Sequence, residues 1–297
     1  MNGCPCENSH VITSDSDSSP IWPVLQRTWP DLPWSEAAFM HGAFHHVAVL
    51  GTSAVVRVGF GADHEIRTQN EFRNLDAISM VNLPFQTPRS LGTIHSTPSW
   101  SAQVSSFVAG KHRDDAGWAA SRGALHGVLC AFQKIPRPAP GVFLPVRQWC
   151  GGPNWPALVE RITLPLDERT RAAAKRVVSE VLACETDVQP TLVHGDFGLH
   201  NVLWTQDRIS GVIDFDHATV GDPAMDVAPL IGQFGAAKLA QIYEPEMISR
   251  AKCHRASLPL QVAAAAELVN DTKLRNHALG NFHKRFRGGN LYDPDTT

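Results

Sequence analysis

The sequence predicts an α+β protein with two lobes, a small N-terminal lobe built on an antiparallel sheet and a mainly helical C-terminal lobe. Three observations lead to this fold class. Runs of β-branched and apolar residues follow one another between 44 and 110, helical periodicity prevails after 117, and a short hairpin pattern interrupts the helices near 201–214. Separate strand-rich and helix-rich stretches are typical of the α+β class.

This pattern divides the chain into three segments. Residues 1–20 contain "SDSDSSP" and lack apolar periodicity, so we expect a disordered tail. Residues 21–110 form the N-terminal lobe and residues 111–297 the C-terminal lobe. The boundary lies near 110 because the character of the sequence changes after that glycine.

The N-terminal lobe is predicted to run strand, strand, helix, strand. The stretch "FHHVAVLGTSAVVRV" (44–58) gives two apolar runs around 51–53, the pattern of a β-hairpin. A helix is expected over 68–80 because Phe72, Leu75 and Ile78 recur at helical spacing. The segment 83–92 is broken by proline, and 101–110 is predicted to be a strand that ends at Gly110.

The C-terminal lobe is predicted to consist mainly of helices. The first covers 118–132, a loop rich in Pro, Gly and Trp follows over 136–156, and a second helix covers 169–184. Most of 222–283 is expected to be helical, with breaks near Pro245 and Pro259. Between these helices, "NVLW" and "SGVID" form a hairpin pattern that turns at Asp207-Arg208.

Composition excludes several classes of function. The 297 residues carry a formal net charge of −3, so the basic field that holds nucleic acid is lacking. The longest apolar stretches fall far short of the roughly 20 residues that span a bilayer, and the first ten residues do not resemble a signal peptide. Six cysteines contain no CxxC pair, which argues against a disulfide framework or a thiolate zinc site. We therefore expect a cytoplasmic protein without a nucleic-acid, membrane or obligate protein partner.

Two clusters of polar residues carry the chemistry, "HGDFGLHNVLW" (194–204) and "VIDFDHATVGDPAMD" (212–226). The hairpin between them is expected to bring Asp196, Asn201 and Asp214 into one neighbourhood. These side chains offer hard oxygen ligands for Mg²⁺ and one further acceptor, as phosphoryl transfer requires. The spacing Asp196-x4-Asn201, with Asp214 thirteen positions later, matches the catalytic loop and the D-F-G aspartate of protein kinases.

On these motifs the chain resembles the aminoglycoside phosphotransferase family, small-molecule kinases with a protein-kinase-like fold, over roughly residues 40–285. The resemblance implies an ATP-dependent enzyme that transfers the γ-phosphate to an alcohol group. Asp196 would orient or deprotonate the substrate hydroxyl, and Asn201 and Asp214 would hold Mg²⁺. Asp226 is expected to anchor the start of a helix to the catalytic loop.

The resemblance also assigns nucleotide contacts to the N-terminal lobe. Arg57 stands where such kinases carry a lysine that contacts phosphate, and Glu71 is the expected helix partner of Arg57. Because a guanidinium replaces the lysine, GTP is an alternative to ATP. Backbone groups of Ser106 and Val108 are expected to meet the purine, and "GAFHH" (42–46) is expected to lie over the phosphates.

Within that family, the motifs resemble most the phosphotransferases that act on the tuberactinomycin peptides viomycin and capreomycin. The implied substrate is one of these or an aminoglycoside, and the implied outcome is antibiotic resistance. Four acidic residues are candidate contacts for a cationic substrate: Asp216, Glu244, Glu267 and Asp271.

Other functions stay open on the sequence. "LPFQTP" also resembles macrolide phosphotransferases, and a metabolic small-molecule kinase would share all of these motifs. The missing lysine suggests a nucleotide-binding pseudokinase. A metal-dependent hydrolase is a further alternative, with a ligand set of His194, Asp196, His200, Asp214 and His217.

Overall fold

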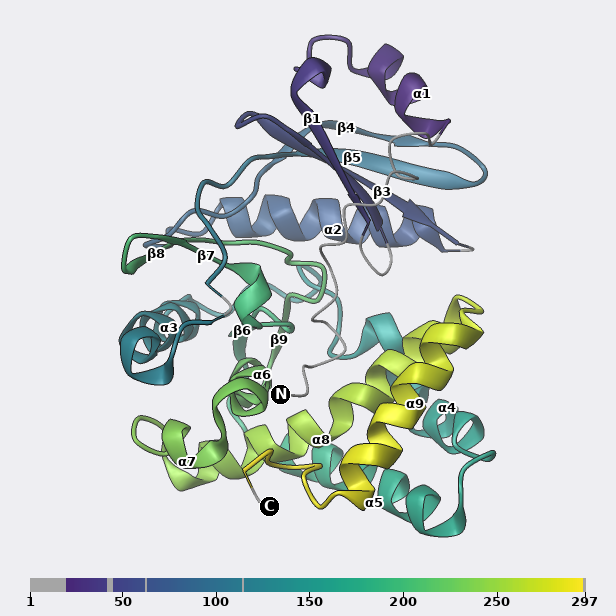
Figure 1. Ribbon diagram of the computed structural model, residues 1–297, viewed down its shortest axis with the longest axis vertical. Coiled ribbons are helices and arrows are strands. Elements are labelled where there is room, and N and C mark those ends of the chain that lie inside the picture. The colour runs from purple at the N-terminus through teal and green to yellow at the C-terminus, as the bar shows by residue number, and fades with distance from the viewer. Residues whose placement is uncertain (1–19, 42–44, 62, 114, 296–297) are drawn as a thin grey trace. The chain divides into compact units, whose positions relative to one another are not determined.

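The computed structural model describes residues 20–41, 45–61, 63–113 and 115–295, so 1–19 of the predicted tail lie outside the described residues. The chain forms two compact units (Figure 1). The first comprises the described residues up to His112 together with Leu203–Asp216, and the second comprises Arg113–Val202 and His217 onward. The predicted lobes differ from these units in one respect, because the sequence assigns 203–216 to the helical lobe.

The first unit contains a five-stranded antiparallel sheet with the order β1-β2-β3-β5-β4. Its strands are β1 (Ala37–His41), β2 (His45–Leu50), β3 (Ala54–Phe60), β4 (Ser90–Ser96) and β5 (Trp100–Ser106). The hairpin predicted around 51–53 is β2–β3, whereas β1 and β4 were not predicted. The strand expected to reach Gly110 ends at Ser106, because the chain then turns and pairs Lys111 with Trp204.

The two faces of this sheet differ in polarity, and a helix lies on each face (Figure 1). Ala54, Val56 and Val58 are buried in a cluster with Trp22 and Leu25, and these last two belong to α1 (Ile21–Thr28). Because side chains alternate along a strand, the residue between Val56 and Val58 points to the other face. That face packs against α2 (His64–Ser79), which extends the predicted helix by four residues at its start.

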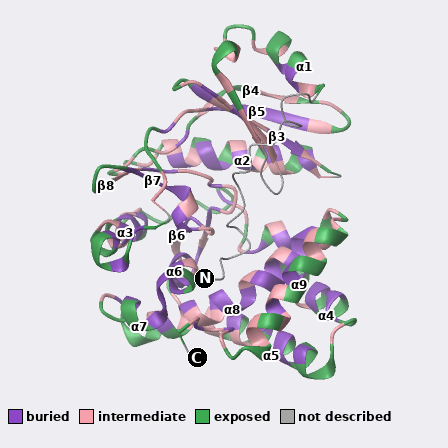
Figure 2. Ribbon diagram, viewed as in Figure 1, coloured by how far each residue is buried: buried purple, intermediate pink, exposed green. Residues whose placement is uncertain are grey.

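The helix α2 buries a polar stripe against the sheet. Its buried residues, visible as the purple part of α2 in Figure 2, are His64, Thr68, Glu71, Asn74, Leu75 and Ile78. The predicted apolar positions 75 and 78 lie at the C-terminal end of this stripe. The opposite strand β5 also turns polar side chains inward, since Ser101, Gln103 and Ser105 are buried. A charged residue on β3 therefore finds polar partners on this face of the sheet.

A second hairpin completes the first unit. It consists of β7 (Val202–Thr205) and β8 (Arg208–Val212), and it turns at Gln206-Asp207, one residue earlier than predicted, with Gln206 in the left-handed region at φ 55°. The backbone of Gln86 bonds Ser210 and Val212 at 2.9 and 3.0 Å. These bonds hold the end of β8, and with it the segment that follows, in the first unit.

The second unit is mainly helical. Its helices are α3 (Trp118–Gln133), α4 (Trp155–Ile162), α5 (Glu168–Cys184), α6 (Ala224–Phe234), α7 (Ala236–Leu239), α8 (Pro245–Leu268) and α9 (Thr272–Arg287). The predicted helices 118–132 and 169–184 are α3 and α5. The break predicted at Pro259 is wrong, because this buried proline lies inside α8. The short helix α4 was not predicted, and the predicted loop 136–156 overlaps only its first two residues.

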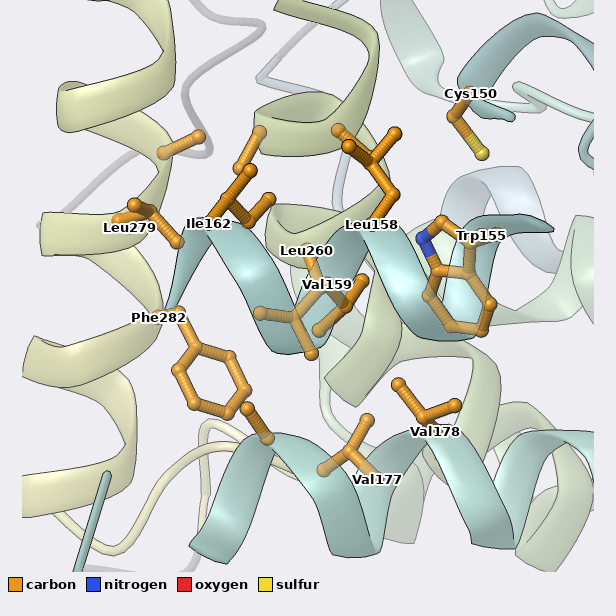
Figure 3. Packing of buried hydrophobic residues seen from close by; sticks show 14 of the residues in the cluster. Cys150, Trp155, Leu158, Val159, Ile162, Val177, Val178, Leu260, Leu279 and Phe282 are labelled. Atoms are coloured by element: carbon orange, nitrogen blue, oxygen red, sulfur yellow. The ribbon is translucent and has the colours of Figure 1, made fainter. Parts of the chain in front are cut away.

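The core of the second unit lies among α4, α5, α8 and α9. Figure 3 shows Trp155, Val159, Val177, Leu260 and Phe282 meeting from these four helices. A two-stranded sheet, β6 (Thr191–Val193) with β9 (Thr219–Gly221), packs beside α3. In the part of the chain that the structure describes, no helix combines the length and the apolar character needed to cross a bilayer.

Candidate active site

The loop after β6 carries the first group of predicted site residues, and a buried aspartate holds it. Asp226, in the first turn of α6, accepts hydrogen bonds from the backbone N–H groups of His194 and Gly195, both at 2.8 Å. Burial raises the pKa of Asp226 to about 7, although these two bonds oppose the shift. The predicted role of Asp226 as the anchor between a helix start and this loop is confirmed.

Gly195 permits the turn at this point. Its φ is +84°, and an added Cβ would lie 2.3 Å from the backbone oxygen of His217. A side chain at this position would therefore clash with backbone and strain the turn. The chain can change direction directly after the buried strand, which presents Asp196 at the end of β6.

Asp196 lies in a small network within the second unit. Its backbone N–H donates to Nδ1 of the fully buried His194 at 3.3 Å, and its backbone oxygen accepts from the Asn201 amide at 2.9 Å. Nε2 of His200 lies 3.6 Å from its carboxylate, whose side chain is 35% exposed. The predicted pair Asp196 and Asn201 is thus brought together, with a carboxylate accessible to a substrate and an amide whose nitrogen is bonded to the loop.

The first unit holds the second group, which we name the Arg57 cluster: Arg57, Glu71, Asp214 and Asp216. The guanidinium on β3 lies 2.9 Å from Glu71, 3.2 Å from Asp214 and 2.8 Å from Asp216. The predicted Arg57–Glu71 pair is present. Asp214 follows the end of β8 with a φ of 66°, a left-handed conformation that aspartate tolerates better than most residues.

The Arg57 cluster holds one guanidinium among three carboxylates. Burial opposes the charge on Arg57, but Asp214, Asp216 and Glu71 overcome this effect and raise its pKa. Burial also raises the pKa of Asp216 well above its usual range, and that of Glu71, despite the attraction of Arg57. Three carboxyl groups thus share one guanidinium, and burial disfavours the charged form of two of them.

Two residues beside the Arg57 cluster were not predicted to contact it, although one of them, His45, belongs to the stretch 42–46 that was expected to lie over the phosphates. His45 lies 3.2 Å from Arg57, and its Nε2 lies 3.8 Å from Glu71. Asn74, which is 2% exposed, donates to the backbone oxygen of Phe215 at 2.8 Å. Its position three residues after Glu71 on the same helix face is the signal that could have identified it.

Asp216 is placed differently from its predicted role. It was a candidate contact for a cationic substrate, but its carboxylate pairs with Arg57 and its side chain is 18% exposed. The guanidinium of Arg57 already forms an ion pair with this carboxylate. The backbone oxygen of Asp216 also accepts a hydrogen bond from the Asn74 amide at 3.3 Å.

The three other acidic candidates belong to the second unit and do not lie together. Glu244 is the N-cap of α8, and Glu267 lies near the opposite end of the same helix, about 35 Å away at 1.5 Å per residue. Glu267 pairs with Arg161 and Arg275 at 3.3 and 2.6 Å. Asp271 caps α9 by accepting from the backbone of Leu274 at 2.9 Å. Glu267 therefore has a role in ion pairs between helices and Asp271 has a role as a helix cap, without any need for a substrate.

The segment predicted to contact the purine follows β5. The N–H of Ser106 donates to the backbone oxygen of Arg89 at 2.8 Å, so it is already used within the sheet. Val108 is 5% exposed, and its side chain lies against Gly211. The predicted phosphate-covering stretch 42–46 is described only at its last two residues, and its first three lie outside the described part of the chain.

The ligand set of the hydrolase alternative does not recur among the metal-binding candidates. Within the described residues, two groups of His, Cys, Asp and Glu side chains are close enough to share an ion. One is His45 with Glu71 and Asp216, and the other is Cys184 with Asp222 and His254. Neither contains His194, His200 or His217, so the geometry lends the hydrolase no support.

Comparison with known proteins agrees with this geometry. A model of the Phosphotransferase enzyme family matches residues 43–256, well over half of the chain. Viomycin phosphotransferase of Streptomyces vinaceus is 29% identical over 239 residues, which cover 74% of this chain and 80% of that protein.

Two solved structures share the fold. The GDP complex of wild-type aminoglycoside 2'-phosphotransferase-IIIa has a TM-score of 0.69 at 16% identity, covering 91% of this chain and 98% of that chain. The streptomycin–ATP–APH(2")-IIa ternary complex has a TM-score of 0.65 at 15% identity, covering 90% and 96%. A sheet-based unit, a helical unit and the loop held by Asp226 are thus the parts of a kinase-like enzyme, and the chain belongs to the Phosphotransferase enzyme family.

Proposed function

We propose that this enzyme transfers the γ-phosphate of ATP to a hydroxyl group of a tuberactinomycin peptide antibiotic such as viomycin or capreomycin, and thereby gives resistance to it. The observation that carries the reaction type is the loop after β6, in which Asp226, His194 and Asn201 all bind the backbone around a partly exposed Asp196. The viomycin phosphotransferase relative supports the class of substrate.

In this proposal Asp196 accepts a hydrogen bond from the attacking hydroxyl and receives its proton, while the new P–O bond forms and the bond from the γ-phosphorus to the bridging oxygen breaks, so that ADP leaves with that oxygen. A positioned carboxylate of this kind orients the nucleophile. The neighbouring His200, at 3.6 Å, is a positive partner for the carboxylate whenever its ring is protonated. The backbone bonds at residues 194–196 keep the carboxylate in place while the substrate binds.

The residues proposed to hold Mg²⁺ fit that ion in their chemistry. Asp214 offers carboxylate oxygens on a side chain that is 39% exposed. Asn201 uses its amide nitrogen for the loop, and in this proposal its amide oxygen is the ligand to the cation. Oxygen donors of this kind suit Mg²⁺ rather than softer metals. Bound Mg²⁺ would neutralise the charge that develops on the transferred phosphoryl group.

Arg57 is proposed to contact the phosphates of the nucleotide. Its Nε atom is buried and has no hydrogen-bond partner within the described residues, although the two terminal nitrogens bind carboxylates. A buried donor without a partner is costly, and a guanidinium binds phosphate strongly, so in this proposal the 16% of the Arg57 side chain that is exposed meets the nucleotide. The carboxylates already bind both terminal nitrogens of Arg57 and hold the side chain in place. We therefore expect Arg57 to contact one phosphate group and orient it.

The test is substrate-dependent release of nucleoside diphosphate, with viomycin, capreomycin, kanamycin, hygromycin and erythromycin as acceptors and ATP or GTP as donors. We expect turnover with the two peptides, and Asp196→Asn should lower kcat by about a hundredfold or more because a required group of the active site is lost. Binding of nucleotide, measured by calorimetry, should persist in this variant.

The matched control is Asp187→Asn, an exposed aspartate in the loop that precedes β6. Its activity should equal that of the unaltered enzyme. Equal activity of Asp196→Asn and Asp187→Asn would refute the role of Asp196. Turnover with erythromycin or an aminoglycoside but not with the peptides would move the substrate to another class, and turnover with none of the five would point to a metabolic kinase.

A further inference from the structure

A cluster of metal-binding side chains lies in the second unit, outside the residues used in the proposed reaction. Cys184 ends α5, Asp222 precedes α6, and His254 lies in the middle of α8. One ligand atom of each lies within 4.8 Å of the other two. Asp222 and His254 are buried at 4% and 2% exposure, and Nε2 of His254 lies 3.2 Å from Oδ2 of Asp222.

A second cysteine adds a fourth donor to this group. Cys253 is next to His254 in α8, outside the group of three, and its thiol faces that of Cys184, which raises the pKa of the Cys184 thiol and lowers that of the Cys253 thiol. Both cysteines are free and half-buried. The cluster therefore offers two sulfur atoms, one imidazole nitrogen and one carboxylate oxygen.

We infer that Cys184, Cys253, His254 and Asp222 form a binding site for a divalent transition-metal ion of the Zn²⁺ type. Two thiolates, an imidazole and a carboxylate are ligands that zinc accepts, and four donors complete its tetrahedral shell. Zinc bonds of about 2.0 to 2.3 Å place ligand atoms roughly 3.3 to 3.8 Å apart. The ligand atoms of Cys184, Asp222 and His254, each within 4.8 Å of the other two, need to approach by about 1 to 1.5 Å, and Cys253, which lies outside that group, has to turn its thiol toward them.

The surroundings of His254 resemble the outer shell of a metal site. Its Nδ1 atom lies 3.8 Å from Oε1 of Glu185, and Glu185 is held by two contacts from Arg147 at 2.6 and 2.5 Å. A metal-binding histidine usually turns its second nitrogen to a carboxylate or carbonyl, which orients the ring. Here Nε2 faces the cluster while Nδ1 faces that carboxylate.

The charges of the group can balance a dication. Arg250 pairs with Asp222 at 3.0 Å, and Arg147 pairs with Glu185. When the two thiols release their protons to solvent on metal binding, four negative groups face two arginines and one divalent ion. The cluster is then neutral, and the carbonyl end of α5, where Cys184 lies, favours a cation.

A metal ion at this site would join three elements of the second unit. It would connect the end of α5, the entry to α6 and the middle of α8, at a point four residues before Asp226. Asp226, at the start of α6, holds the loop after β6. The bound ion is therefore expected to stabilise the start of α6, and through Asp226 that loop. Its role is structural, and it does not depend on the proposed substrate.

The test uses the full-length protein with Cys4→Ser and Cys6→Ser, because these thiols, which lie outside the described residues, would compete for the probe. The protein is reduced, treated with a chelator and titrated with Co²⁺. We expect the absorption bands of thiolate-ligated, four-coordinate Co²⁺ to saturate at one equivalent, and Zn²⁺ to abolish these bands. Their absence at a several-fold excess of Co²⁺ would overturn the inference.

Variants identify the ligands. Cys184→Ser and Cys253→Ser should each lose a large part of the thiolate absorption, and Glu185→Gln should weaken metal affinity about 10-fold to 100-fold, as is typical of outer-shell residues. Cys130→Ser removes a half-buried thiol on α3 and is the matched control, with unchanged absorption expected. An unchanged spectrum in Cys184→Ser would overturn the site.

A second measurement does not require that any variant folds. In the reduced protein, Zn²⁺ should slow alkylation of Cys184 and Cys253, and should leave the rate at Cys130 unchanged, as followed by mass spectrometry of peptides. Equal rates with and without Zn²⁺ would contradict the inference. Formation of a Cys184–Cys253 disulfide in a protein that fails to bind Co²⁺ would also overturn it, because the pair would then serve redox chemistry.

Discussion

Arg57 is the residue at which this chain departs from the kinase pattern that its other motifs follow. A lysine at this position would offer one ammonium group, whereas the guanidinium reaches Glu71 and Asp214 through one terminal nitrogen and Asp216 through the other. The planar fork suits several carboxylates at fixed angles. We therefore infer that an arginine stands at position 57 because Asp216 needs a second positively charged nitrogen beside it.

The variant Arg57→Lys tests this pairing. An ammonium group cannot span both sides of the cluster, so Asp216 would remain buried without its partner, and we expect the free energy of unfolding to fall by about 1–3 kcal/mol. The KM for ATP should rise, because the phosphate contact is lost, while kcat should change less. Urea denaturation and steady-state kinetics measure the two effects.

The matched control is Arg67→Lys, which changes an arginine of α2 that pairs with Asp63 at 3.0 Å on a more exposed surface. We expect its stability to stay within about 0.5 kcal/mol of the unaltered protein. Equal losses in the two variants would show that the Arg57 cluster has no special requirement for a guanidinium.

Among the helices, N-capping explains two aspartates, one of which, Asp271, was a candidate substrate contact on the sequence. Asp167 and Asp271 cap α5 and α9 through the backbone N–H groups of Thr170 and Leu274. The helix α8 continues through Pro259, because this residue is buried in the packed interior, and tertiary packing offsets the missing hydrogen bond. Propensity alone predicts a break at such a position.

Asp271 distinguishes a capping role from a substrate role. Asp271→Ala should lower the free energy of unfolding by about 0.5–2 kcal/mol, whereas Asp271→Asn should preserve stability because asparagine is an equally good N-cap. The KM for the antibiotic should be unchanged in both variants. A KM that rises in Asp271→Asn at unchanged stability would instead assign the negative charge to substrate binding.

Across the described residues, two of the hydrophobic clusters lie in different units, and further buried residues such as Phe132, Leu192 and Ile231 belong to neither. The first lies between α1 and the apolar face of the five-stranded sheet, and the second lies among α4, α5, α8 and α9. Each core draws its buried side chains from one unit. Stability can therefore differ between the units, as is common for regions that open independently.

Paired core variants test this independence. Trp22→Ala and Phe282→Ala each remove a buried aromatic side chain, and each should cost about 3–5 kcal/mol. Hydrogen exchange followed by mass spectrometry should detect faster exchange in β1–β5 for Trp22→Ala, and in α5, α8 and α9 for Phe282→Ala. Acceleration of both units by either variant would mean that the two cores unfold as one.

Features that depend on local pattern were predicted correctly from the order of the amino acids. The spacing of Asp196 and Asn201, the hairpin around 51–53 and the helices α3 and α5 all follow from residues close together in the chain, because periodicity and turn chemistry act over a few positions. The pairing of Arg57 with Glu71 came from the family resemblance, and the structure contains it.

Contacts between side chains that are far apart in the chain could not be predicted in this way, because they depend on packing. Asp216 joins Arg57 across 159 positions, Asn74 reaches the backbone of Phe215 across 141, and Cys184, Asp222 and His254 meet although no short cysteine motif marks them. Sequence composition even argued against a thiolate site. Such contacts depend on how helices and strands pack, and side-chain periodicity specifies which face of an element is buried without specifying what that face will meet.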